Sequence, residues 1–280
     1  EVFDVTKKAM RAVEVRGVTT YELSPRDPLI ACFAPEEKGT GRGACISLVD
    51  ALSGAVVRSH IVYKALRCTF HWHPAGRYLA AQLDSRGKGQ TTVSSLVLFR
   101  MLERCPTEVV EEPAHRIAEL RWEPDYGTRF AYVRTDAQPG TVPVGRKGRV
   151  VVYNMGPRGS KARRVAEIDH GASQLSWSPQ QGMLLLCDYT AASCTTEFCN
   201  TNTQESLATA QHYNATSIQW DPSGRYVALV SSTTAEKKSA DAGYDLYSFT
   251  GKILDRATKI GFAQFLWRPR PPCALSDDSL

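Results

Sequence analysis

The chain lacks the features by which several common classes of protein are recognised. Its 280 residues contain no apolar run near the roughly 20 that a membrane-spanning helix needs. They contain no G-x-x-x-x-G-K-[ST] phosphate loop, and residues 171–175, which come nearest to a G-x-S-x-G nucleophile elbow, end in leucine. Helical periodicity is almost absent. We therefore expect no membrane segment, no small-molecule substrate, no cofactor and no catalytic residue.

The cysteine content does not indicate a disulfide-bonded protein. Eight cysteines are an even number, but disulfide frameworks are typical of short secreted domains with small cores. Hydrophobic residues make up 42% of this chain, and its cysteines are scattered, mostly within apolar runs. We therefore expect reduced, buried thiols and a cytoplasmic location. The chain begins at Glu1 without an initiator methionine or a signal-peptide pattern, which indicates a fragment or a processed form.

What the chain does have is a repeat built on tryptophan and proline. Each of its five tryptophans is followed two residues later by proline, and a sixth copy has leucine in the tryptophan position. Successive copies lie 43 to 55 residues apart, and a period of roughly 40–50 residues is typical of β-propeller blades. The repeat positions are Leu23, Trp72, Trp122, Trp177, Trp220 and Trp267.

The residues around each tryptophan predict two strands joined by a tight turn. In residues 218–230 an apolar strand leads to Asp221, and the following Pro-Ser-Gly has the residue preferences of a type I turn. Two more strand-like segments follow in each copy, which makes four short strands per repeat. Because a buried indole removes about 150–250 Å² from water, we expect the tryptophans to pack between blades. Stacking on RNA bases is the alternative.

These observations predict an all-β fold, a WD40-like β-propeller with five full blades and partial blades at both ends. Two strands, around residues 2–5 and 12–15, precede the first copy, and one strand accompanies Trp267. The blades could close as a six-bladed ring or form an arc of a larger one. We expect the partial propeller to span residues 1–272 and a C-terminal tail to start at 273–280.

Several motifs resemble one family. They are Phe-Arg-Met at 99–101, Ala-Glu-Leu-Arg-Trp-Glu-Pro at 118–124, Trp-Ser-Pro-Gln at 177–180, Gln-His-Tyr at 211–213, Trp-Asp-Pro-Ser-Gly-Arg-Tyr-Val at 220–227 and Leu-Trp-Arg-Pro-Arg-Pro-Pro at 266–272. Over about residues 23–272 the chain resembles the family of the b subunits of eukaryotic translation initiation factor 3. It departs from that pattern at Leu23, in the loop 135–148 and in the cysteine-rich stretch 187–199.

The resemblance implies an arc of a nine-bladed propeller. It implies a non-catalytic scaffold that binds the small (40S) ribosomal subunit, its rRNA and proteins, and the i, g and a subunits of initiation factor 3. It also implies an exit from the ring toward a partner-binding tail, where prolines stop strand pairing. The exit residues are Arg268, Pro269, Arg270, Pro271 and Pro272.

Positive charge is concentrated in one window. The whole chain carries a formal charge of +5, yet residues 134–164 alone contain eight basic residues and one acid. Two interpretations stay open, a surface for RNA phosphates and a solvated loop whose charge favours solubility. The candidate ribosome-binding residues are Arg86, Lys88, Arg146, Lys147, Arg149, Arg158, Lys161, Arg163, Arg164, Lys237 and Lys238.

Three other interpretations are weaker. A non-catalytic propeller of a serine peptidase or hydrolase has similar Trp-Ser-Pro turns, but it would need a hydrolase domain elsewhere in the gene. A generic WD-repeat hub would end a strand with a Trp-Asp pair. Cys68, His71 and His73 have the spacing C-x2-H-x-H, but structural zinc takes four ligands, so we predict no metal site and a packed strand there.

Overall fold

The chain folds almost entirely into β-strands, in two compact units. The computed structural model describes residues 2–4, 8–37, 39, 41–87, 91–103, 106–112, 115–124, 127–136, 148–179, 182–189, 193–233 and 242–268. One unit comprises Glu1–Gly171 and the other Ala172–Leu280. Among the residues described, no helix is long and apolar enough to cross a membrane.

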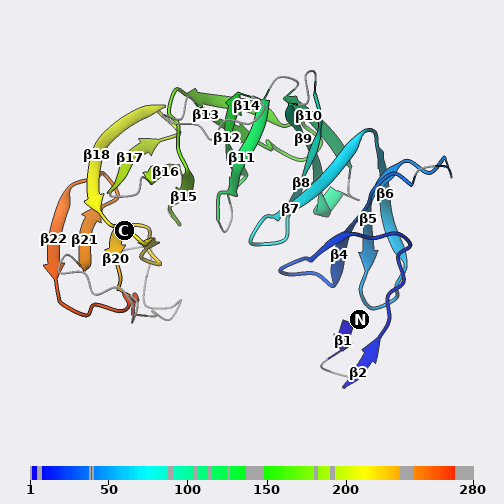
Figure 1. Cartoon of the computed structure of the whole chain (residues 1–280), viewed down its shortest axis with the longest axis horizontal. Coiled ribbons are helices and arrows are strands. Elements are labelled where there is room, and N and C mark those ends of the chain that lie inside the picture. Colours follow the sequence, from blue (N-terminus) through cyan, green and yellow to red (C-terminus); the bar gives the residue numbers. More distant parts are fainter. Residues whose placement is uncertain are drawn as a thin grey trace. The chain divides into compact units, whose positions relative to one another are not determined.

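The first unit contains a two-stranded sheet and three four-stranded antiparallel sheets, each in sequential strand order (Figure 1). A 3-10 turn, η2 (Met101–Glu103), follows β9. The strands are β1 (Val2–Asp4), β2 (Ala9–Arg11); β3 (Thr20–Leu23), β4 (Leu29–Ala34), β5 (Ala44–Asp50), β6 (Val56–Val62); β7 (Ala65–Trp72), β8 (Tyr78–Arg86), β9 (Thr92–Arg100), β10 (Thr107–Glu112); β11 (His115–Trp122), β12 (Arg129–Asp136), β13 (Gly148–Asn154) and β14 (Arg163–Ile168).

The second unit contains two more sheets of the same kind. Their strands are β15 (Gln174–Trp177), β16 (Met183–Tyr189), β17 (Ser193–Asn200), β18 (Glu205–Tyr213); β19 (Ser217–Trp220), β20 (Tyr226–Ser231), β21 (Gly243–Ser248) and β22 (Ile253–Thr258). Five sheets of four strands confirm the predicted all-β propeller class. The nine-bladed ring stays a prediction.

The core lies between neighbouring sheets, and the middle strands supply most of it. Leu79 and Ala81 of β8 are fully buried and belong to one apolar cluster with Phe33 of the preceding sheet. The next cluster joins β7–β10 to β11–β14, and a third joins β15–β18 to β19–β22. Outer strands such as β6 are mostly exposed. The sheets thus stack face to face because their middle strands are apolar on both sides.

Local hydrogen bonds explain why the chain reverses after each first strand. The Asp221 carboxylate accepts the amide of Ser223 at 3.1 Å and that of Tyr226 at 2.8 Å. The Gly224 amide donates to the Asp221 carbonyl at 2.9 Å, as a β-turn requires. Gly224 and its counterpart Gly76 have φ of +70° and +68°, a conformation that favours glycine.

Two strand predictions differ from the structure. The second N-terminal strand is β2 (Ala9–Arg11), whereas the expected segment 12–15 is not a strand. Its alternating valines, Val13 and Val15, pack instead against a buried cluster on β4 and β5, so their periodicity reflects a covering role. Residues 259–268, which include Trp267, also form no strand.

Candidate interaction surfaces

The tryptophans lie at equivalent places in the sheets. Four of them end the first strand of a sheet, at β7, β11, β15 and β19. The Trp122 indole donates to the His71 carbonyl at 2.8 Å, and the Trp267 indole donates to the Gln219 carbonyl at 3.1 Å. Each acceptor directly precedes the tryptophan of the previous sheet. These two indoles therefore bond to the first strand of the preceding sheet, although Trp267 itself lies in no strand, and this role is structural.

The residue after the tryptophan makes a second contact between sheets. His73 is fully buried, and its Nε2 lies 3.1 Å from the carbonyl oxygen of Gly127 in the next turn. Ser178 is also fully buried and donates to the carbonyl of Gly224, again in the next turn, at 3.2 Å. Turn therefore bonds to turn along each stack. The sequence analysis did not predict this contact. The signal for it was that a polar residue, such as His73 or Ser178, directly follows the tryptophan.

The described residues do not form a metal centre. His71 Nε2 lies 3.2 Å from the Gln82 amide oxygen, and His73 is occupied by Gly127. Throughout the described ranges, no group of three or more His, Cys, Asp or Glu side chains is arranged to hold a metal ion. Six cysteines in these ranges carry free thiols, and all but Cys45 are buried.

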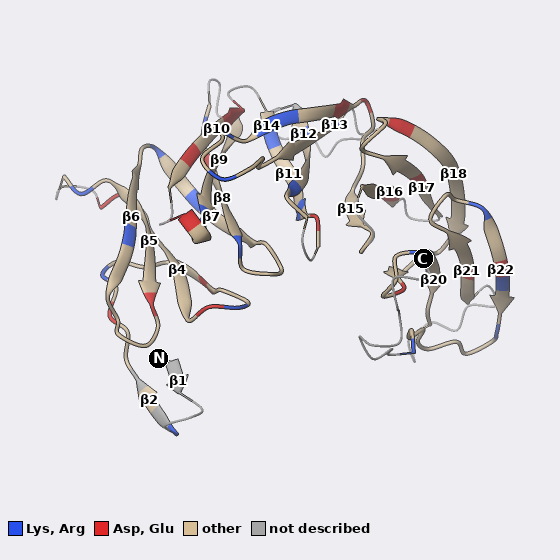
Figure 2. Ribbon diagram, turned by 180° about the vertical axis from the view of Figure 1, so that it is seen from behind, with Lys and Arg blue, Asp and Glu red and all other residues tan. Residues whose placement is uncertain are grey.

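Several basic residues lie on β13, on β14 and in the connection between them, and we call this group the basic surface; Figure 2 marks the positions of Lys and Arg in blue. We define it by the described residues that the sequence also predicted. All of them are exposed: Arg149 on β13, Arg158 and Lys161 in the β13–β14 connection, and Arg163 and Arg164 on β14. Arg158, Lys161 and Arg163 make no ion pair with any residue that the structure describes. These three cations are thus available to an acidic partner.

One carboxylate neutralises part of this basic surface. Glu167 accepts hydrogen bonds from Arg134 at 2.6 Å and from Arg149 and Arg164 at 2.8 Å each. The hydrogen bond from Arg149, with the charges of Arg134 and Arg164, holds the pKa of Glu167 below its usual value despite partial burial. Glu167 lies three residues beyond the window that predicted the charge, so the sequence overstated the free positive charge.

The other predicted binding residues are spread along the chain. Arg86 lies exposed at the end of β8, and Arg268 lies exposed after β22. Arg86 thus belongs to the sheet β7–β10, and Arg268 belongs to the second unit. The remaining predicted residues, Lys88, Arg146, Lys147, Lys237, Lys238, Pro269, Arg270, Pro271 and Pro272, lie outside the described residues.

A polar cluster joins the last two sheets. His212 of β18 contacts the Asp245 carboxylate of β21 through Nδ1 at 2.9 Å. Arg256 of β22 donates to both oxygens of the same carboxylate, at 2.7 and 3.0 Å. Burial alone would raise the pKa of Asp245, but the bonds from Arg256 and His212 outweigh it and hold that pKa below its usual value. This cluster ties three strands together.

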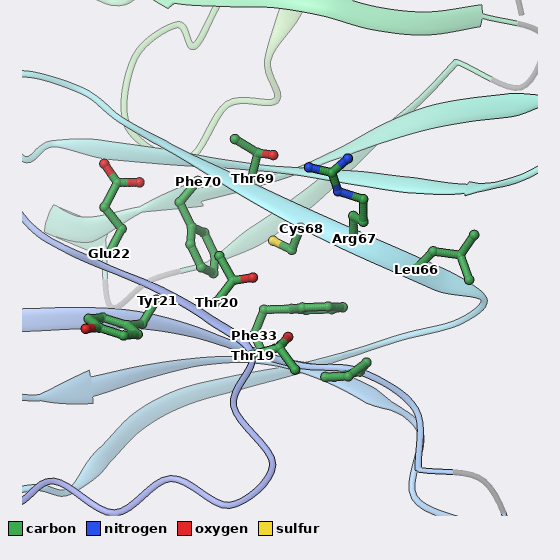
Figure 3. Close-up of a pocket in the computed structure, with 11 residues that line it drawn as sticks. Thr19, Thr20, Tyr21, Glu22, Phe33, Leu66, Arg67, Cys68, Thr69 and Phe70 are labelled. Atoms are coloured by element: carbon green, nitrogen blue, oxygen red, sulfur yellow. The ribbon is translucent and has the colours of Figure 1, made fainter.

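A groove lies between β3 and β7, in the first unit (Figure 3). Its cavity measures about 500 Å³, and the residues that line it come mainly from the segments 19–22 and 66–70. Leu23, which ends β3 in place of a tryptophan, is 56% exposed. Sequence reasoning did not predict this groove, although the missing tryptophan at position 23 was a signal.

Comparison with known protein families shows to which family the chain belongs. A family model described as "Eukaryotic translation initiation factor eIF2A" matches residues 60–265, well over half of the sequence. The chain belongs to the eukaryotic translation initiation factor eIF2A family. The match begins in β6 and ends after β22, so the eIF2A family region includes four of the five sheets in full.

Curated relatives of this eIF2A-family chain are named as the B subunit of eukaryotic translation initiation factor 3. The Xenopus laevis protein is 31% identical over 273 residues, which cover 96% of this chain and 38% of the relative. The Nicotiana tabacum protein is 32% identical over 282 residues, which cover 99% of this chain and 38% of the relative. These relatives confirm the resemblance seen in the motifs. The chain spans about two fifths of their length.

A solved structure agrees on the fold. It is described as "Crystal structure of the eukaryotic initiation factor", and it matches with a TM-score of 0.71 at 17% identity. The match covers 95% of this chain and 61% of the other. At 17% identity, the match shows only that the eIF2A-family chain and this solved structure share a fold. The names of its sequence relatives lend no support to a peptidase propeller.

Proposed function

We propose that the chain is part of a non-catalytic scaffold subunit of initiation factor 3, which binds the small ribosomal subunit during translation initiation. The observation that carries this proposal is the identity of about 30% to the B subunits of that factor over nearly the whole chain. The repeated sheets supply a rigid platform, which suits a scaffold. We further propose a cytoplasmic location and contacts with the i, g and a subunits, with residues 273–280 starting the tail.

The basic surface is the part of the described chain best suited to ribosomal RNA. Arg158, Lys161 and Arg163 are exposed, lie within six residues and have no acidic partner among the described residues. The connection that carries Arg158 and Lys161 and leads into Arg163 of β14 is held in place, because the amides of Gly159 and Ala162 donate to the carboxylates of Glu103 and Glu108. Cations on a fixed connection can contact a phosphate backbone without a large loss of conformational entropy.

Charge reversal tests this assignment. The triple variant Arg158→Glu, Lys161→Glu, Arg163→Glu is expected to weaken binding of the assembled initiation factor to purified small ribosomal subunits. If all three side chains contact phosphates, the slope of log K against log salt should fall by roughly 2 to 3. Binding would be measured by fluorescence anisotropy at several salt concentrations, with circular dichroism as a check of folding.

A matched control separates local contact from overall charge. The triple variant Arg58→Glu, Lys252→Glu, Lys259→Glu makes the same charge change at exposed positions on other strands and loops. We expect it to bind nearly as the wild type does. Equal loss of affinity in both triple variants, or no loss in either, would exclude the basic surface as the contact site.

The opposite change is expected to strengthen binding. Glu167→Gln removes the carboxylate that Arg134, Arg149 and Arg164 share. Arg134 keeps its pair with Glu112 and Arg149 its pair with Asp169, so it is mainly the charge of Arg164 that becomes available to phosphates. The affinity for small ribosomal subunits should rise about two- to tenfold at low salt, with a steeper salt dependence. Weaker binding by this variant in the same assay would contradict this expectation. It would mean that Glu167 holds the arginines in the positions in which they contact ribosomal phosphates.

A further inference from the structure

The groove between β3 and β7 arises from a difference in strand length. β7 has eight residues, whereas β3 has four, and both end at the repeat position. Counted back from that position, Thr20 is level with Thr69, so the segment 65–68 of β7 has no strand of the preceding sheet beside it. Four strand residues extend about 13 Å. The groove overlaps this uncovered segment in part, because its lining runs from Leu66 to Phe70 on β7 and from Thr19 to Glu22 opposite.

The next junction along the chain shows what a closed interface looks like. β7 and β11 each have eight residues. There the Trp122 indole donates to the His71 carbonyl, and its ring stacks on Tyr78 with centroids 5.5 Å apart. At the β3 junction the buried Trp72 Nε1 has no hydrogen-bond partner in the part of the chain that the structure describes, and the same is true of Trp220 Nε1 in the second unit. The β3–β7 junction thus lacks the indole hydrogen bond of its neighbour, and it is here that the groove lies.

The groove has an apolar floor and an acidic end. Figure 3 shows Phe70 and Cys68 of β7 pointing toward Phe33 and Thr20, whereas Arg67 projects from the other side of β7. Tyr21, at the rim, is 70% exposed. Leu66, at the other end of the rim, is 54% exposed.

Glu22 is the charged residue on the β3 side of the groove. It makes no ion pair with another described residue, and partial burial raises the pKa of its carboxyl group. A positive charge beside Glu22 would therefore stabilise its ionised carboxylate, which partial burial destabilises.

We propose that this groove binds an extended segment of a partner protein, which lies along β7, places one aromatic or branched aliphatic side chain in the cavity that Phe33 and Phe70 line, and sets a basic side chain beside Glu22. β3 and β7 are each an edge strand of their sheet, so each has main-chain groups available to a further strand. The cavity volume lies within the range of sites that enclose a large side chain or small ligand. This inference does not depend on ribosome binding.

An immobilised peptide library tests the proposal. The peptides are octamers in which position four is scanned through all residues and a lysine or a glutamate is placed two or four residues away. They are probed with the purified full-length protein. We expect the binders to share an aromatic or branched aliphatic residue at position four and a lysine, and the matching glutamate peptides not to bind.

Two variants locate the binding in the groove. The double variant Tyr21→Ala, Leu66→Ala removes the exposed rim and should weaken the best peptide roughly tenfold. Glu22→Lys should reverse the preference, so that glutamate peptides bind better than lysine peptides. The double variant Ile253→Ala, Leu254→Ala removes two exposed apolar side chains elsewhere and should bind as the wild type does.

Several outcomes would overturn the proposal. They are the absence of any binding octamer, equal binding of the same peptides by Glu22→Lys, and equal loss in both alanine double variants. A concentration-dependent self-association that the rim variant abolishes, measured by analytical ultracentrifugation, would assign the groove to a second copy of the chain instead. Ribosome binding is measured separately, so failure here leaves the proposed function to its own test.

Discussion

Replacing Trp122 with alanine should lower the free energy of unfolding by about 3–5 kcal/mol. The side chain is only 6% exposed and lies in the cluster between β7–β10 and β11–β14, so its removal leaves a cavity between two sheets. The loss would appear as a lower midpoint of urea unfolding, followed by circular dichroism. A change below about 1 kcal/mol would mean that this indole does not hold the sheets together.

Two phenylalanine variants separate packing from hydrogen bonding at the repeat positions. Trp122→Phe keeps most of the ring but removes the bond to the His71 carbonyl. Trp72→Phe makes the same change where the indole nitrogen has no partner among the described residues. The Trp122 variant should therefore be the less stable of the two by about 1 kcal/mol. Equal losses would indicate that packing alone carries the effect of the repeat.

Asp245→Asn is expected to lower the free energy of unfolding by about 2 kcal/mol at pH 7. The change removes the negative charge that Arg256 and buried His212 share. We expect less than the loss usual for a fully buried ion pair, because the Arg256 side chain is 62% exposed and its charge is screened by water. Asp255→Asn, a nearby change on exposed β22, is the matched control and should cost less than about 0.5 kcal/mol.

The effect of Asp245 should depend on pH in one direction. Its pKa is lowered in the folded chain, so its stabilising contribution is complete above the unfolded value of about 3.9. The contribution is lost as the pH falls through the lower folded value. Urea midpoints of wild type and Asp245→Asn should therefore differ at pH 7, and the difference should shrink as the pH falls below the unfolded value and through the lower folded value. A constant difference down to about pH 2 would contradict the ion-pair explanation.

Repeat chemistry made the sheets predictable. The pairing of tryptophan with a proline turn marks the end of one strand and the start of the next, as at Trp220 and Asp221. These are local preferences, set within a few residues by proline φ, by side-chain hydrogen bonds to the backbone and by glycine at positive φ. At the N-terminal end, alternation alone failed for residues 12–15, because an extended covering segment and a strand share the same period of two.

The sequence predicted where positive charge is concentrated, but not which of the basic side chains are paired with acidic residues. The basic window led to Arg158, Lys161 and Arg163, which the structure places exposed on the β13–β14 connection and at the start of β14. The same window also counted Arg134, Arg149 and Arg164, which share Glu167. Those arginines lie on three different strands, so their common partner depends on strand register rather than on sequence distance.

The sequence by itself determined the all-β class and the family of the chain, since turns, strand periods and motifs are properties of neighbouring residues. Only the tertiary structure decided which arginines share Glu167, where His212 meets Asp245, and that a groove lies between β3 and β7. These features depend on contacts between residues far apart in the chain. Strand register and sheet stacking create such contacts, and neither can be derived from a local pattern.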